Sequence, residues 1–166
     1  MSQSTEYKKV FICSPFRGNV ALNIERCRGY CRFACKNHYI PFAPHLFYPQ
    51  FLRDNVESER KLGIHHGIEM LKLCDEMWVF RAEDKSITEG MQAEIEQAKA
   101  LNMRIKFFRY NYAIELFGLD VDAFEERAAI IQYESNISRT EAEIKALDCL
   151  WNWNSLVLVN ICYIKN

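Results

Sequence analysis

Four short apolar segments, separated by stretches long enough to form helices, constrain the fold of this chain more than any other feature. They cover residues 10–13, 39–43, 76–80 and 103–108. Short continuous apolar runs are typical of buried parallel strands, and parallel neighbours need a helical crossover between them. The repeated order of strand and helix therefore predicts an α/β fold, a three-layer sandwich in which helices cover both faces of a parallel sheet.

The stretches between the apolar segments show helical periodicity. From residue 20 to residue 38, apolar positions recur in alternating steps of four and three, which predicts a helix with Asn19 as its N-cap. The predicted face of this helix contains Val20, Ile24, Cys27, Cys31, Ala34 and His38. We interpret residues 44–50 as an ordered aromatic loop and residues 54–73 as a helix without a regular apolar face.

A third helix is expected to begin close to Ser86 and to carry a candidate functional carboxylate. Ser86 and Glu89 have capping-box spacing. The residues that then repeat at helical spacing, and that predict a face toward the sheet, are Met91, Ile95, Ala98 and Leu101. Glu94 lies along the edge of this face, near the positive N-terminus of the helix. It is therefore either a surface glutamate that borders the core or a partly desolvated carboxylate with a functional role.

After residue 110 the character of the sequence changes. Residues 120–136 and 138–153 are predicted helices, and Ser138 with Glu141 forms a capping box for the second. The run from residue 156 to residue 164 is strongly apolar. It either completes the sheet or packs on a second subunit, because exposure would leave a large apolar patch. We therefore divide the chain into an α/β domain, residues 1–110, and a helical C-terminal extension with an apolar tail, residues 111–166.

Composition excludes several functional classes. The 166 residues include 21 basic and 22 acidic side chains, so the formal charge of −1 gives no sign of a nucleic-acid-binding surface. The N-terminus lacks the apolar run of a signal peptide, and no segment approaches the roughly 20 apolar residues of a membrane span. These features predict a cytoplasmic protein without a nucleic-acid or membrane partner.

The cysteines do not predict a metal or a disulfide framework. Seven is an odd number, and short paired metal-ligand spacing is missing, which indicates reduced thiols that serve as small core residues. Cys27, Cys31 and Cys35 recur every four residues, but on one helix they spread along about 12 Å and cannot converge on one ion. The adjacent His65 and His66 point in different directions on a helix. We predict neither a metal nor another cofactor.

The loops that follow the strands are the expected site, because open parallel sheets bind ligands at the carboxyl ends of their strands. These loops are residues 14–19, 44–50 and 81–94. The candidate ligand-binding residues are Ser14, Pro15, Phe16, Arg17 and Gly18 from the first loop, His45 from the second, and Ser86, Gly90 and Met91 from the third. For His45, contact with a ligand and capping of a turn are both open interpretations.

Three segments of the chain together resemble the nucleoside 2-deoxyribosyltransferase-like superfamily, and within it the uncharacterised branch of small stand-alone domains. The first is Val-Phe-Ile-Cys-Ser-Pro-Phe-Arg-Gly-Asn at residues 10–19, and the second is Leu-Cys-Asp-Glu-Met-Trp-Val-Phe at residues 73–80. In the third, residues 86–98, the pattern is carried by Ser86, Gly90, Met91, Glu94, Ile95 and Ala98. The resemblance covers about residues 8–108 and implies a flavodoxin- or Rossmann-like fold.

The resemblance also implies a chemistry. Glu94 matches the carboxylate that attacks the anomeric carbon of a 2-deoxynucleoside, in a glycoside exchange that retains configuration through a covalent intermediate. Gly90 would let the ligand approach the backbone, and Arg17 and Ser14 would face the nucleobase. Asp75 matches an Asp at the mouth of the third strand, and its place at the N-terminal end of that strand favours a structural role.

The chain departs from the superfamily at two positions where the resemblance implies acids. Thr88 lies six residues before Glu94, and Gly67 lies in the helix that precedes the third strand. These acids would support departure of the base, so another carboxylate would have to replace them. The candidates near the nucleophile are Glu83, Asp84 and Glu89.

Three functional hypotheses follow from the sequence. The first is an enzyme that transfers or hydrolyses the N-glycosidic bond of a nucleoside or nucleotide, with Glu94 as nucleophile. The second is a catalytically inactive module that binds or senses a nucleotide. The third is an oligomerising assembly protein whose apolar tail matters more than its cleft. The expected partner is a small nucleoside or nucleotide, and the resemblance implies a homo-oligomer.

Overall fold

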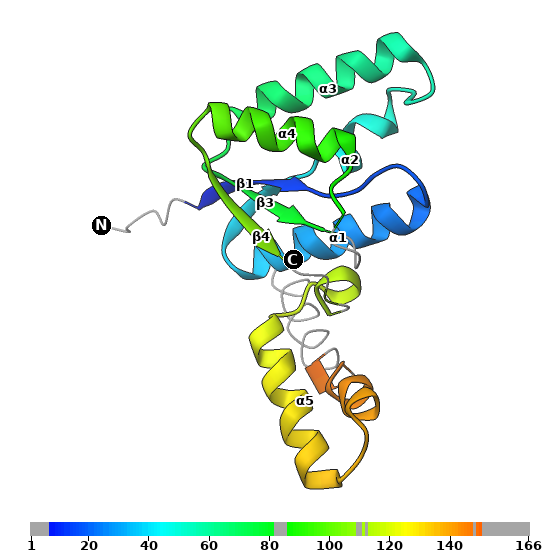
Figure 1. Cartoon of the computed structure of the whole chain (residues 1–166), viewed down its shortest axis with the longest axis vertical. Coiled ribbons are helices and arrows are strands. Elements are labelled where there is room, and N and C mark those ends of the chain that lie inside the picture. Colours follow the sequence, from blue (N-terminus) through cyan, green and yellow to red (C-terminus); the bar gives the residue numbers. More distant parts are fainter. Residues whose placement is uncertain (1–6, 82–85, 109–110, 112, 148, 151–166) are drawn as a thin grey trace, which may run out of the picture. The chain divides into compact units, whose positions relative to one another are not determined.

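A four-stranded parallel sheet forms the centre of the first of two compact units, residues 1–118 and 119–166, in the computed structural model (Figure 1). The residues that the structure describes are 7–81, 86–108, 111, 113–147 and 149–150. The strands are β1 (Lys8–Cys13), β2 (Tyr39–Phe42), β3 (Glu76–Phe80) and β4 (Arg104–Phe108), and their order in the sheet is β2-β1-β3-β4. Every neighbouring pair is parallel.

Helices cover both faces of this sheet. α3 (Glu57–Leu71) and α4 (Glu89–Ala100) lie on one face, and α1 (Val20–Lys36) lies on the other (Figure 1). The core under α3 and α4 consists of Phe11, Cys13, Leu71, Met77, Val79, Met91, Ile95 and Ala98. On the opposite face, Tyr30 stacks on Phe80 with ring centroids 4.0 Å apart. The predicted fold class is confirmed: an α/β three-layer sandwich with a parallel sheet and C-terminal helices.

The buried face of α1 differs from the predicted one. Asn19 caps the helix as expected, because its side chain accepts a hydrogen bond of 3.2 Å from the Leu22 amide. The face toward the sheet, however, is formed by Asn23, Cys27, Tyr30, Phe33 and Ala34, whereas Val20 and His38 are exposed. The large rings decide the orientation of the helix, because Tyr30 and Phe33 pack on aromatic residues of β3.

The N-terminus of α4 also differs from the prediction. The N-cap is Thr88, whose hydroxyl accepts a hydrogen bond of 3.3 Å from the Met91 amide, so the predicted capping box of Ser86 and Glu89 is wrong. Met91, Ile95 and Ala98 are buried as predicted, but Leu101 follows the last turn and is 43% exposed. A threonine directly before the helix satisfies one of the free amides, which leaves Ser86 outside the helix.

Residues 44–50, predicted as an ordered aromatic loop, form helical turns. They form one turn of α-helix, α2 (Pro44–Phe47), followed by a 3-10 turn, η1 (Tyr48–Gln50). Proline occupies an early position in each turn, where its missing amide hydrogen costs no helical hydrogen bond. The helix expected at residues 54–73 is present as α3, within narrower bounds.

The first unit extends beyond the predicted boundary at residue 110. A π-helical turn, η2 (Ala113–Phe117), packs on α1. The approach is so close that a Cβ on Gly29 of α1 would lie 2.1 Å from the backbone oxygen of Glu115. The buried Glu115 also forms an ion pair with Arg26. These contacts attach η2 to the first unit, which ends at Gly118.

The second unit is helical in its described part. α5 (Val121–Ser135) is capped by Asp120, and residues 139–147 and 149–150 are helical as well. The predicted capping box is confirmed: the Ser138 amide donates to Glu141 Oε2 at 3.0 Å, and the Glu141 amide donates to Ser138 Oγ at 3.3 Å. The predicted apolar tail, residues 156–164, lies outside the described residues.

Within the described ranges, none of the helices is long and apolar enough to cross a membrane.

Candidate functional site

A cavity of about 230 Å³ lies where the chain leaves β1, β2 and β3. Its walls come from the loop after β1, from α2 and η1, from α3 and from the first turns of α4. Ligand pockets usually measure about 300–1,000 Å³, so this cavity suits a small molecule of nucleoside or mononucleotide size better than a dinucleotide. The place of the cavity is the one expected for a ligand site in an open parallel sheet.

The structure brings most of the predicted site residues together. Those that line the cavity are Ser14, Phe16, Arg17, His45, Gly90, Met91 and Glu94. Three predicted residues do not line it. Pro15 is half-buried between two lining residues, Gly18 occupies the turn before α1 with a positive φ of 93°, and Ser86 is exposed two residues before the N-cap of α4.

Glu94 is held in the cavity wall by the packing of α4. Met91, one turn earlier, and Ile95 are both in the core, which fixes the rotation of the helix and places Glu94 at the boundary between core and cavity. Oε2 of Glu94 is buried and accepts no hydrogen bond from any described residue. Burial raises the pKa of the Glu94 carboxyl to about 7, although a hydrogen bond from the Cys13 thiol lowers it in part.

Two residues at the end of β1 lie near Glu94. The Cys13 thiol is fully buried, lies 3.9 Å from the Met91 carbonyl oxygen, and has a pKa raised by burial and by the neighbouring Glu94. Ser14 lines the cavity and is 1% exposed, and its hydroxyl forms no hydrogen bond of standard geometry with a described residue. Buried polar atoms are almost always paired, so the two unpaired oxygens of Ser14 and Glu94 make this part of the cavity the candidate ligand site.

An aromatic pair forms one side of the cavity. The ring of Phe16 stacks on the imidazole of His45, with centroids 5.2 Å apart and planes inclined by 14°. Burial lowers the pKa of His45, and this effect outweighs the opposing influences of the Ser14 backbone and Asp54. His45 is therefore neutral at pH 7. It lies in α2 and also lines the cavity, and no side-chain hydrogen bond caps this turn.

Charged side chains surround the mouth of the cavity. Arg17 Nη2 lies 3.3 Å from Asp54 Oδ2, and Arg60 Nε lies 3.8 Å from Asp54 Oδ1. Glu59 also lines the cavity, and Arg53 holds it through a backbone hydrogen bond of 2.6 Å and a side-chain hydrogen bond of 2.9 Å.

Sequence reasoning missed the site residues of α3 and of the turns before it. Those with polar side chains are Tyr48, Asp54, Glu59 and Arg60. Tyr48 fell within a predicted site loop without being singled out. The other three lie in or beside a helix without apolar periodicity, so no pattern indicated which of its side chains face the cavity. Glu89 and Thr88 line the cavity as well.

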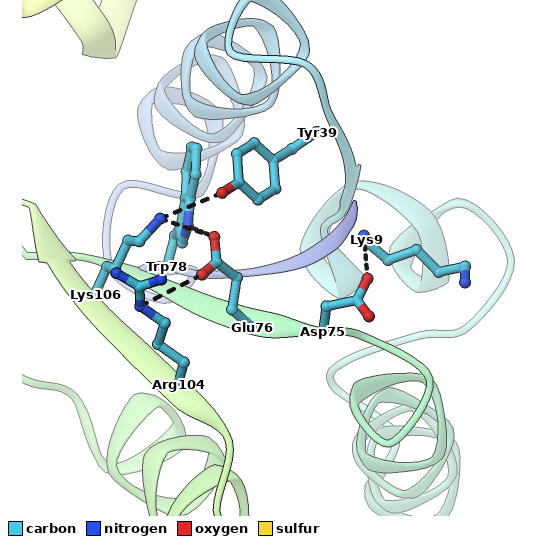
Figure 2. A network of polar contacts seen from close by, with 7 residues as sticks. All are labelled: Lys9, Tyr39, Asp75, Glu76, Trp78, Arg104 and Lys106. Atoms are coloured by element: carbon cyan, nitrogen blue, oxygen red, sulfur yellow. Dashed lines mark hydrogen bonds and ion pairs between the residues drawn. The ribbon is translucent and has the colours of Figure 1, made fainter. Parts of the chain in front are cut away.

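A second polar cluster lies at the opposite edge of the sheet, where the strands begin (Figure 2). The buried Glu76 of β3 accepts hydrogen bonds from Trp78 Nε1 at 3.0 Å and from Lys106 Nζ at 2.9 Å, and it forms an ion pair with Arg104 at 3.8 Å. Burial raises the pKa of Glu76, but the hydrogen bonds from Lys106, Trp78 and Tyr39 lower it more, so the carboxylate is ionised.

Asp75 belongs to this edge and not to the cavity. Its Oδ2 accepts a hydrogen bond of 2.6 Å from the Lys9 amide, and its own amide donates to the Lys9 carbonyl oxygen at 2.9 Å (Figure 2). Asp75 thus joins the start of β1 to the residue that precedes β3, in line with the structural role favoured from the sequence.

Among the described residues, no group of three or more histidine, cysteine and carboxylate side chains is arranged to hold a metal ion. Cys27 is buried, Cys31 is half-buried and Cys35 is exposed, so the three thiols lie in different surroundings along α1. The cavity therefore offers a carboxylate, a hydroxyl, an aromatic pair and a charged mouth as its chemical groups.

The parallel sheet, its two helix layers and the cavity define an α/β domain with a candidate small-molecule site. The chain belongs to a family described as Domain of unknown function (DUF7768), whose sequence model matches residues 8–108. This match extends from β1 to β4 and includes every residue that lines the cavity. No curated protein matches the chain. The family description names no activity, so the function has to be argued from the site.

Proposed function

We propose that this protein is an enzyme that acts on the N-glycosidic bond of a nucleoside or nucleotide, by transfer or hydrolysis, with Glu94 as the nucleophile. One observation carries the proposal: Glu94 has a buried, unpaired carboxylate oxygen in the wall of a cavity of the size of a small ligand. The unpaired oxygen of this carboxylate is available for bonding to substrate, because no described residue donates a hydrogen bond to it. The resemblance to nucleoside 2-deoxyribosyltransferase-like proteins points to the same residue.

The chemistry has two steps. In the first, a Glu94 oxygen bonds to the anomeric carbon while the bond from that carbon to the base nitrogen breaks, and the base leaves with the electron pair and takes up a proton. In the second step, water or another base attacks the same carbon and releases the Glu94 carboxylate. Two displacements at one carbon retain its configuration. The Phe16–His45 pair would pack beside the base, and the Ser14 hydroxyl would bind a polar group of the sugar or base.

The proton for the departing base needs a donor. Of the carboxylates considered as replacements for the missing acids, Glu89 lines the cavity, whereas Glu83 and Asp84 lie outside the described residues. Glu89 occupies the first turn of α4, five residues before Glu94. We assign the role of general acid to Glu89 within this proposal.

Turnover of nucleosides tests the proposal directly. The protein would be incubated with 2-deoxynucleosides, ribonucleosides and their monophosphates, with and without a second free base, and base release and exchange would be followed by chromatography. Glu94→Gln should reduce turnover by on the order of a thousandfold or more while it leaves substrate binding in place. Glu96→Gln is the matched control, because Glu96 is exposed on the same helix, accepts a hydrogen bond from Gln92 and does not line the cavity. Equal loss in both variants, or full activity in Glu94→Gln, would contradict the proposal.

A second candidate function is a nucleotide-binding or sensing module without catalysis. Two observations favour it. Thr88, at a position where an acid was implied, uses its hydroxyl to cap α4. Gly67, at the other such position, is buried against Pro44, where an added Cβ would lie 3.6 Å from the proline ring. A sensor would bind a nucleotide, release no base from any of the compounds tested and bind equally well after Glu94→Gln.

Oligomer formation and a cytoplasmic location belong to the same proposal. The resemblance implies that a neighbouring chain completes the site, which light scattering after size-exclusion chromatography would test as a mass above that of one 19.6 kDa chain. The six cysteines among the described residues are free thiols, which suits a reducing compartment.

A further inference from the structure

Two arginines at the mouth of the cavity share a single carboxylate. Arg17 follows β1, Arg60 lies near the start of α3, and both approach Asp54, at 3.3 Å and 3.8 Å. The two guanidinium groups contact different oxygens, Oδ2 for Arg17 and Oδ1 for Arg60. All three residues line the cavity. The mouth therefore presents two cations that converge on the position of one anion.

The neighbouring charged side chains do not neutralise the net positive charge of the triad formed by Arg17, Arg60 and Asp54. Two guanidinium groups against one carboxylate leave a positive charge at the mouth. The neighbouring Glu59 is engaged by Arg53, which donates to it from its backbone and its side chain. The remaining carboxylates that line the cavity are Glu89 and Glu94, both on α4. The cavity thus has an acidic wall on α4 and a basic mouth between the β1 loop and α3.

The ion pairs of Asp54 with the two arginines are weak. The side chains of Arg17 and Asp54 are 59% and 40% exposed, and the second contact is 3.8 Å long. Ion pairs in such positions contribute little, because water screens them and because long side chains lose entropy. A phosphate group carries up to two negative charges and three acceptor oxygens, and guanidinium groups bind it in a bidentate way. It would therefore compete successfully with one carboxylate for both arginines.

We propose that Arg17 and Arg60 form a phosphate subsite at the mouth of the cavity, so that the ligand is a nucleoside monophosphate and not a free nucleoside. This inference rests on the proposed function for the nucleoside part of the ligand. It also gives Arg17 a different partner from the nucleobase expected from the sequence. Asp54 acts as the counter-ion that orients both guanidinium groups and that the phosphate displaces.

Binding measurements test the subsite without requiring turnover. Calorimetric titrations would compare 2-deoxyadenosine, 2-deoxycytidine, 2-deoxyguanosine and thymidine with their 5′-monophosphates. For the base that binds, the monophosphate should bind at least about tenfold more tightly than its nucleoside, and Arg17→Gln and Arg60→Gln should each remove most of this advantage. Lys61→Gln is the matched control, because Lys61 neighbours Arg60 in sequence but is exposed, pairs with Glu57 and does not line the cavity. Circular dichroism would confirm that all variants are folded.

Asp54→Asn supplies a test in the opposite direction. Removal of the competing carboxylate should strengthen binding of inorganic phosphate at least severalfold, whereas a purely structural triad would predict no gain. Equal affinity for nucleoside and monophosphate, an advantage that survives both arginine substitutions, or failure of every monophosphate to bind would overturn the subsite. Release of base from free nucleosides together with equal affinities would leave the proposed function intact and remove only this inference. Tighter binding of monophosphates than of nucleosides, without any base release, would support the phosphate subsite and contradict the proposed catalytic function.

Discussion

Two carboxylates of the same sheet-and-helix unit, Glu76 and Glu94, have opposite surroundings. Glu76 lies at the edge where the strands begin and is surrounded by Trp78, Lys106 and Arg104, which together satisfy its charge. Glu94 lies at the edge where the strands end, and one of its oxygens has no partner among the described residues. Burial acts on both groups, but the pKa of Glu76 is lowered and that of Glu94 is raised to about 7. The hydrogen-bond and ion-pair partners, and not burial alone, therefore account for the opposite pKa shifts of the two carboxyl groups.

The difference separates an edge built for stability from the edge that carries the candidate ligand site. A buried charge persists when the protein supplies its hydrogen bonds, as at Glu76, and it costs free energy when the protein does not, as at Glu94. A fold keeps such a cost where a ligand or a reaction makes use of it. The same substitution, glutamate to glutamine, should consequently have opposite effects on stability at the two positions.

The largest effect on stability is expected for Glu94→Gln above neutral pH. The folded-state pKa of about 7 exceeds the ordinary value of 4.5, so the folded protein binds the proton more tightly, and its stability decreases as the pH rises from 4.5 through 7. Glutamine lacks this penalty. At pH 8 the variant should be more stable than the wild type by up to about 3 kcal/mol, and at pH 4 the two should be nearly equal.

Urea unfolding at pH 4, 6 and 8 measures this difference. Glu96→Gln serves again as the control and should show no such pH trend, because Glu96 is exposed. A Glu94→Gln protein that is less stable than the wild type at pH 8 would show that the carboxylate is satisfied, and the contrast with Glu76 would not hold.

Glu76→Gln should destabilise the protein by about 2 kcal/mol at pH 7, because the charge-assisted hydrogen bond to Lys106 is lost. The folded-state pKa of Glu76 is lowered, so its stabilising contribution is present above pH 4.5 and is lost as the pH falls below that value. The deficit of the variant should therefore shrink at low pH. Parallel urea curves of wild type and variant at pH 4 and 7 give the answer, and a deficit that grows on acidification would refute the assignment.

The contrast between the two edges was only partly accessible from the sequence. Residues 76–80 were predicted as β3 with the observed bounds, because a continuous apolar run needs no long-range information to be recognised as a buried strand. The partners of Glu76 were not predicted. Lys106 is 30 residues away, and only the pairing of β3 with β4 brings it beside Glu76. Register between strands is decided by the whole sheet and not by local sequence.

The residues of the cavity, too, could be predicted only in part from the sequence. Ser14, Phe16, His45 and Glu94 were predicted because the parallel topology places all loops after strands at one edge. Arg60 was not, because α3 buries only Gly67 and Leu71 and therefore has no apolar stripe that reveals its orientation. The error at the start of α4 has a related cause: two hydroxyl residues, Ser86 and Thr88, compete for the cap, and spacing alone did not decide between them.

The smallest predicted effect is a shift in the pH dependence of catalysis after substitution of Cys13. In the proposed mechanism Glu94 has to be ionised to attack the sugar, so the acid limb of the pH profile for base release by the wild type should rise about tenfold per pH unit below 7. The Cys13 thiol donates a hydrogen bond that favours the carboxylate. Cys13→Ala should therefore shift the midpoint of this profile upward by less than about one pH unit, since a thiol is a weak donor.

Cys35→Ala controls for the loss of a thiol, because Cys35 is exposed on α1 and does not line the cavity. Its profile should coincide with that of the wild type. A downward shift in Cys13→Ala would mean that the thiol raises the pKa of Glu94, and it would contradict a stabilising hydrogen bond from Cys13 to this carboxylate. An unchanged midpoint would mean that the Cys13 thiol donates its hydrogen bond to the Met91 carbonyl oxygen alone. Glu94 would then receive no hydrogen bond from the end of β1.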